Sequence, residues 1–132
     1  MDCLFCKIIN QEIPSYKIFE NEYTYAFLDI NPVANGHTLV IPKKHFEDYS
    51  STDDFYLAEV AKTKKIVANL LVEKLGAKGF NYVANEKEIS GQIVFHYHDH
   101  IVPKYEIGKG YMHSNNRVDI EELENVFANI KK

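Results

Sequence analysis

Three histidines lie at every second position of the stretch QIVFHYHDHIVPKY, residues 92–105: His96, His98 and His100. Alternate residues of a β-strand point to the same face, so we expect the three imidazoles to share one surface. A neutral imidazole can act there as a nucleophile while its neighbours carry charge and protons. A shared metal ion is the second interpretation, but three histidines on one nearly straight strand are widely spaced for it. The pattern favours nucleophilic catalysis over a metal site and over ordinary half-exposed strand residues.

The residues just before these histidines favour a phosphate ligand. Gly91 allows the backbone to approach a ligand closely, and Gln92 supplies a side-chain amide. A nucleophilic imidazole also needs one ring nitrogen held as N–H, usually by a backbone carbonyl, so that the other keeps its lone pair. The loop and the histidines together predict a site that can hold a phosphate beside a nucleophile.

Cys3 and Cys6 form a second group with chemical potential, a Cys-x-x-Cys pair. Such a pair suits two corners of a tetrahedral zinc site, which two nitrogens would complete. A redox pair and two buried thiols are the alternatives, although the βαβ context of thioredoxin-like proteins is missing. The sequence therefore favours a structural metal site at the N-terminus.

Composition and charge exclude several classes of function. The 132 residues are 45% hydrophobic and carry a formal charge of -4, which gives no general attraction to a nucleic acid polymer. No apolar run approaches the roughly 20 residues of a membrane span, and the N-terminus lacks the features of a secretion signal. We expect a cytoplasmic protein that forms a single domain over residues 1–132.

The hydrophobic pattern predicts the elements that position these residues. Aromatic and β-branched runs predict five strands, over residues 16–20, 24–30, 37–45 with its end near Pro42, 80–85 and 93–103. A long helix is expected over residues 51–75, and a second helix after a capping box formed by Asp119 and Glu122. This order predicts an α+β fold with an antiparallel sheet. The broad apolar surface of the long helix suggests that it also packs on a second copy of the chain.

The stretch GQIVFHYHDHIVP resembles the signature of the histidine triad (HIT) superfamily, His-x-His-x-His-x-x followed by proline. The segment from Phe5 to His45 resembles the N-terminal half of the same family, and the spacing between the halves is preserved. The resemblance covers residues 3–105, while 106–132 form a C-terminal extension. It implies the HIT-like fold and a homodimer. It also implies hydrolysis or transfer at the α-phosphorus of a purine nucleotide conjugate, either a nucleoside phosphoramidate or a dinucleoside polyphosphate.

The resemblance also assigns roles to individual residues. His98 would be the nucleophile that forms a nucleotidyl-histidine intermediate, His100 would assist charge and leaving-group protonation, and His37 would lie behind the nucleophile. The side chains of Asn85 and Gln92, and the backbone N–H of Ile93, would bind phosphate. Asp29 would bind the ribose hydroxyls. The apolar walls of the base slot would be Phe5, Ile13, Phe27 and Ile30, although core packing explains these four equally well.

The same resemblance completes the metal site. It implies a structural Zn²⁺ held by Cys3, Cys6, His45 and His96, with no metal required for catalysis. Two positions depart from the family pattern, since Asp99 occupies a spacer that is usually apolar and Ile93 replaces a frequent polar residue. A buried Asp99 carboxylate would need a partner. The competing interpretation of the whole chain is a nucleotide-binding sensor or scaffold with little turnover.

Overall fold

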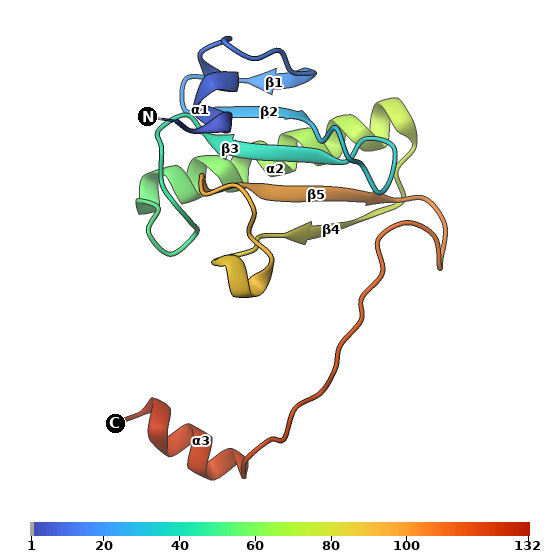
Figure 1. The fold of residues 1–132 in the computed structure, drawn as a ribbon. Coiled ribbons are helices and arrows are strands. Elements are labelled where there is room, and N and C mark those ends of the chain that lie inside the picture. The colour runs from blue at the N-terminus through green and yellow to red at the C-terminus, as the bar shows by residue number, and fades with distance from the viewer. Residues whose placement is uncertain (1) are drawn as a thin grey trace.

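The structure, a computed structural model, describes residues 2–132 and has an α+β architecture (Figure 1). The elements follow in the order α1 (Leu4–Ile9), β1 (Lys17–Glu20), β2 (Thr24–Leu28), β3 (Thr38–Pro42), α2 (Asp54–Leu75), β4 (Gly79–Val83), a short 3₁₀ turn (Glu88–Ser90), β5 (Asp99–Lys104) and α3 (Leu123–Ile130). The five strands form one antiparallel sheet in the order β1-β2-β3-β5-β4. The predicted fold class, with five strands and two main helices, is confirmed.

The central strands are buried on both faces because their alternate side chains pack against different helices. Tyr25 and Phe27 of β2 belong to the cluster formed with α1, whereas Ala26 belongs to the cluster formed with α2. In β3, Leu39 and Ile41 likewise lie with α1, and Val40 lies with α2. This alternation explains the nearly continuous apolar runs of both strands. It also places α1 and α2 in two separate cores across the sheet.

Helix α2 agrees closely with its prediction. It ends at Leu75 before Gly76, whose φ of 73° is the left-handed conformation that ends many helices. Its first residue is Asp54, because the preceding residues form turns in which the hydroxyl and amide groups of Ser51 bond to Asp48. The buried residues of α2 face the sheet, and Val60 and Val67 are fully enclosed.

Two boundary predictions are wrong. The last strand begins at Asp99 and not at residue 93, because the Tyr97 N–H donates to the carbonyl of Phe46 at 2.7 Å and leaves the strand ladder. The C-terminal helix begins at Leu123, and its cap residue, Glu122, makes no side-chain capping bond. The proposed capping box at Asp119 is therefore absent from the structure.

The C-terminal segment extends away from the sheet, and α3 lies apart from the other elements (Figure 1). The apolar residues of this segment are exposed, and they include Val118, Ile120, Leu123, Phe127 and Ile130. No helix within residues 2–132 combines the length and the apolar character required to cross a bilayer.

Candidate active site and metal centre

A cavity of about 450 Å³ lies between α1 and the sheet, beside the histidine segment. Apolar side chains of α1 and of strands β2 and β3 form much of its lining, which also contains polar residues. Residues predicted for the site and found in its lining are Phe5, Ile13, Phe27, Asp29, Ile30, Asn85, Ile93, His98 and His100. The fold thus brings together residues that are far apart in the chain.

His98 has one free ring nitrogen. Its Nδ1 lies 2.8 Å from the His96 carbonyl oxygen, and a carbonyl only accepts, so Nδ1 carries the hydrogen. The lone pair is therefore on Nε2, as nucleophilic attack requires. Burial lowers the pKa of His98, although the bond to His96 opposes this, and only 9% of the side chain is exposed. The ring is held neutral against Phe5, whose ring centre lies 5.0 Å away in an edge-to-face contact.

His37 and His100 form a hydrogen-bonded chain with a defined direction. The Val33 N–H points at His37 Nδ1 at 3.3 Å, so the hydrogen of His37 is on Nε2. That Nε2–H donates to His100 Nδ1 at 3.0 Å, which leaves His100 with its hydrogen on Nε2. Burial lowers the pKa of His37, and burial followed by the neighbouring imidazoles lowers that of His100 to about 4. His100 thus keeps an N–H that can donate a hydrogen bond to a leaving group.

Asp29 completes this group, with its Oδ2 3.5 Å from His37 Nε2 and 3.9 Å from His100 Nδ1. Two imidazoles and a carboxylate this close are also a possible metal-binding set. A metal on His37 Nε2 would force the hydrogen onto Nδ1, where it would face the Val33 N–H. Hydrogen bonding therefore explains this group better than metal binding.

The loop before the histidines forms another part of the cavity lining. Asn85, Gly91 and Ile93 line it, and Gly91 has a φ of 99°, a conformation that side chains disfavour. Ile93 is 86% exposed and contributes an apolar edge, as its departure from the family pattern suggested. The cavity lining thus includes the side-chain amide of Asn85 and contains no arginine.

Gln92 occupies a different place from the one expected. Its side-chain nitrogen donates to the carbonyls of Glu47 and Val94 at 2.8 and 3.0 Å, and its oxygen accepts from the Lys87 N–H at 2.8 Å. The side chain is 3% exposed and does not line the cavity. Its amide is therefore engaged by the backbone, and we leave Gln92 out of the phosphate donors proposed below.

The four residues expected to form a base slot have mixed environments. Phe5 and Phe27 line the cavity and also belong to the buried cluster around α1, Ile13 is half-buried, and Ile30 is 80% exposed. The cavity wall also contains residues that sequence reasoning did not select: Leu4, Ile8, Leu39 and Val94. Two of these had a recognisable signal, because Ile8 follows Phe5 by three residues on α1 and Leu39 pairs with Phe27 across the sheet.

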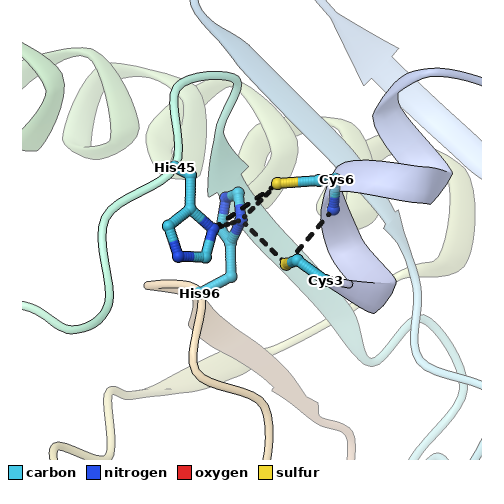
Figure 2. A group of neighbouring side chains, drawn as sticks. All are labelled: Cys3, Cys6, His45 and His96. Carbon is cyan, nitrogen blue, oxygen red and sulfur yellow. Dashed lines mark hydrogen bonds between the residues drawn. The ribbon is translucent and has the colours of Figure 1, made fainter. Parts of the chain in front are cut away.

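The second group of predicted residues converges beside α1 (Figure 2). His45 Nδ1 lies 3.1 Å from His96 Nδ1, and the sulfur of Cys6 lies 3.5 Å from each of these nitrogens. The sulfur of Cys3 lies 3.5 Å from His96 Nδ1. Zinc bonds of about 2.0 Å to nitrogen and about 2.3 Å to sulfur place two tetrahedral nitrogen ligands about 3.3 Å apart, and a nitrogen and a sulfur about 3.5 Å apart. The spacing fits a tetrahedral ion.

Protonation supports the same conclusion. His96 Nε2 lies 2.9 Å from the Pro42 carbonyl, so it carries the hydrogen and Nδ1 keeps the lone pair. Burial lowers the pKa of His96 to about 4, and burial raises that of Cys6 to about 11. His96 Nδ1 has a single lone pair, yet the sulfurs of Cys3 and Cys6 and the Nδ1 of His45 all lie within 3.5 Å of it. One cation at the centre can satisfy all four, and it would also draw the thiols to thiolates.

Asp99, the second departure from the family pattern, has partners on the face of the sheet opposite the cavity. Its carboxylate accepts a short hydrogen bond from the Tyr97 hydroxyl and lies 3.3 Å from Lys64 Nζ on α2. Burial, then the Asp99 charge, raises the pKa of Tyr97, which keeps the phenol a donor. The buried carboxylate is thus paired, as physical reasoning required.

A sequence profile described as HIT domain matches residues 10–107 of the chain. An uncharacterised HIT-like protein of Mycoplasma genitalium is 54% identical over 92% of this chain and 86% of its own length. An adenosine 5'-monophosphoramidase of Candida albicans is 39% identical over 82% of this chain and 74% of its own length. Both sequence identities, over these shares of the chains, are high enough to indicate a common family.

Comparison with solved structures indicates the same family. A HIT family member from Bacillus subtilis superposes with a TM-score of 0.87 at 38% identity, covering 99% of this chain and 96% of its own. A Zn-bound histidine triad family protein from Mycobacterium smegmatis has a TM-score of 0.80 at 36% identity, over 89% and 85% of the two chains. The predicted resemblance to this superfamily is confirmed over nearly the whole chain.

Proposed function

The chain belongs to the HIT family, and from that premise we propose that it is a nucleotide hydrolase or transferase that acts at the α-phosphorus of purine nucleotide conjugates. Nucleoside phosphoramidates are the preferred substrate class, and dinucleoside polyphosphates are the second. The observation that carries the proposal is the free Nε2 of His98, which the His96 carbonyl leaves unprotonated at the edge of the cavity. The activity of the related monophosphoramidase supports it.

The geometry suggests two chemical steps. In the first, His98 Nε2 forms a bond to the α-phosphorus while the bond to the leaving group breaks; the His100 Nε2–H donates a hydrogen bond to the leaving atom, which departs with a proton taken from solvent. In the second, water attacks the phosphorus, the P–Nε2 bond breaks, and the proton lost by the attacking water returns to solvent. Between the steps the nucleotidyl-imidazole carries a positive charge, which the His96 carbonyl stabilises through its hydrogen bond to Nδ1.

The remaining cavity residues bind the substrate in this proposal. The Asn85 amide and the backbone N–H of Ile93 donate to the phosphate, and the Asp29 carboxylate accepts from the ribose hydroxyls. The apolar walls of Phe5, Ile13, Phe27 and Ile30 enclose the base. Because neutral donors and imidazoles surround the phosphate, we propose no catalytic metal.

We further propose that Cys3, Cys6, His45 and His96 hold a structural Zn²⁺. Four protein ligands leave no position for substrate, so the ion would tie α1 to the end of β3 and to the histidine segment. The Zn-bound relative from Mycobacterium smegmatis supports a metal in this family. A cytoplasmic location stays a prediction.

A homodimer is also proposed. Ile66, Val72 and Leu75 leave apolar surface exposed on α2, and β4 lies at the edge of the sheet. A second copy of the chain could cover both, since edge strands pair readily. The exposed apolar side chains of α3 would then have a surface to pack against.

Hydrolysis of adenosine phosphoramidate tests the catalytic proposal. Wild type should release AMP, and His98→Ala should lower the rate by about 1,000-fold or more because it removes the nucleophile. His113→Ala is the matched control, since His113 bonds to Asn81 outside the cavity lining and should keep full activity. Equal turnover by wild type and His98→Ala would reject the assignment. Nucleotide binding by wild type without turnover would favour the sensor.

A further inference from the structure

The nucleophile lies on a segment that the sheet does not hold. Strand β5 begins at Asp99, so His98 precedes the first residue of the ladder. The Tyr97 N–H bonds to Phe46 in a loop, and the neighbouring side chains alternate between the two faces. His98 faces the cavity, whereas Tyr97 and Asp99 pack on the side of α2. The His96 carbonyl and the Phe5 ring orient the His98 imidazole, and contacts of the neighbouring residues must fix the backbone that carries it.

A buried polar network on the α2 side supplies these contacts. Asp99, only 4% exposed, accepts from the Tyr97 hydroxyl and pairs with Lys64 Nζ at 3.3 Å. The same ammonium group lies 5.5 Å from the centre of the Tyr82 ring on β4, in a cation–π contact. Tyr49 packs edge-to-face on Tyr97 with 5.8 Å between ring centres. Residues on both sides of His98 are thus tied to a helix and to a neighbouring strand.

The hydrogen bond and ion pair of this network depend on the position and orientation of each group, whereas apolar packing does not. A buried carboxylate tolerates little movement away from its partners, because losing them leaves a charge without compensation. Lys64 lies in the turns of α2 that also contain the fully buried Val60 and Val67, so its position relative to the sheet is fixed. Any shift of residues 97–99 along or away from the sheet would stretch the Tyr97–Asp99–Lys64 contacts.

We propose that Tyr97, Asp99 and Lys64 form a positioning lock that holds His98 and His100 at the attack geometry from behind the sheet. The lock touches neither substrate nor cavity, so its members are positioning residues. This inference rests on the proposed function for its kinetic consequence. It predicts that loosening the lock slows formation of the nucleotidyl-histidine intermediate and leaves nucleotide affinity nearly unchanged.

The test uses the full-length protein and side-chain changes that remove one contact each. Tyr97→Phe deletes one hydroxyl, Lys64→Met deletes the charge while keeping the aliphatic length, and Lys64→Arg restores the charge. Lys62→Met is the matched control, because the Lys62 side chain on the same helix is 72% exposed and does not contact Tyr97 or Asp99 through a hydrogen bond or ion pair. Single-turnover formation of the intermediate is measured at saturating adenosine phosphoramidate, together with AMP affinity and melting temperature.

Tyr97→Phe and Lys64→Met should each slow intermediate formation by about 10-fold, because small misplacements of reacting groups are costly. Their AMP affinity should stay within about twofold of wild type, and Lys64→Arg should recover most of the rate. The double variant should lose less than the product of the two single losses, since both changes loosen one unit. Lys62→Met should match wild type.

A readout independent of activity separates this inference from the proposed function. In ¹⁵N-labelled protein, ring-nitrogen resonances report the tautomer of His98, which should be Nδ1–H in wild type and a mixture in the two lock variants. Wild-type protein that forms no intermediate would refute the hydrolase proposal, while the ring resonances would still test the lock. Folded lock variants with the wild-type rate and wild-type His98 resonances would overturn the lock. A rate loss matched by an equal loss of AMP affinity would show a general structural effect and overturn it as well.

Discussion

Removing the proposed zinc should detach α1 and, with it, one wall of the cavity proposed to bind the nucleotide. The helix Leu4–Ile9 contains six residues, and ordering them costs about 6 to 12 kcal/mol of conformational free energy. Burying Phe5 and Ile8 returns about 3 to 6 kcal/mol. The bonds from Lys7 N to Cys3 O and from Asn10 N to Cys6 O add about 2 kcal/mol net.

Without metal the helix is therefore balanced at best, whereas structural zinc sites contribute about 10 to 16 kcal/mol. Release of α1 removes Phe5 and Ile8 from the cavity wall. A loss of only about 1.4 kcal/mol of contact weakens binding tenfold, so we expect AMP affinity to fall by about 10-fold or more.

The assay combines metal analysis, hydrogen exchange over residues 3–10 and AMP titration, before and after chelation. Purified protein should contain one zinc per chain. The double variant Cys3→Ser with Cys6→Ser should match the stripped protein and should not respond to chelator. Verified zinc-free protein with unchanged protection of α1 and unchanged AMP affinity would refute the reasoning, and freshly prepared protein without any metal would reject the site.

Three further predictions concern stability and assembly. Gln92→Leu should destabilise the fold by about 2 kcal/mol in urea unfolding, because the backbone groups of Glu47, Lys87 and Val94 lose their hydrogen bonds to the Gln92 amide. Burial lowers the pKa of His100 to about 4. As the pH falls, this histidine is therefore protonated in the unfolded chain before it is protonated in the folded chain. The free energy of unfolding should thus fall by about 3 kcal/mol between pH 6.5 and 4 on account of His100, and this part should be absent in His100→Asn. Light scattering should give twice the chain mass for the full-length protein. After truncation at Ile107 the dimer should dissociate at a higher protein concentration. A monomeric full-length chain would reject the dimer.

The sequence predicted the fold well where local residue patterns decide the structure. The aromatic and β-branched runs over β2 and β3 and the stop signal at Gly76 predicted these elements to within a few residues. It failed where long-range contacts decide. The Tyr97 N–H leaves the ladder because the Phe46 carbonyl is close in space, and nothing local to residues 93–98 indicates this. In the C-terminal segment, no packing surface supports the helix that the capping pattern predicted to begin near Asp119.

In the candidate site, too, the local sequence predicted some features, and long-range contacts decided the others. The type and spacing of the histidines indicated a nucleophile, and the spacing of Cys3 and Cys6 indicated a metal pair. The convergence of His45 on that pair came only from resemblance, since 39 residues separate it from Cys6. For Gln92 the residue type suggested a phosphate donor, but the fold encloses its amide between two loops. Residue type reveals which groups can react, and only the tertiary contacts reveal which remain free to do so.

For two histidines of the segment, His96 and His98, a backbone carbonyl decides which ring nitrogen stays free. The Pro42 carbonyl fixes the hydrogen of His96 on Nε2 and turns Nδ1 toward the cysteines, and the His96 carbonyl fixes the hydrogen of His98 on Nδ1 and leaves Nε2 to the cavity. The two sites are therefore joined by one residue, because a metal that holds the His96 ring also holds the peptide group on which the His98 tautomer depends. Zinc would then act on catalysis through orientation, without touching the substrate. Stripping it should broaden the His98 ring-nitrogen resonances even at nucleotide concentrations that saturate the weakened site.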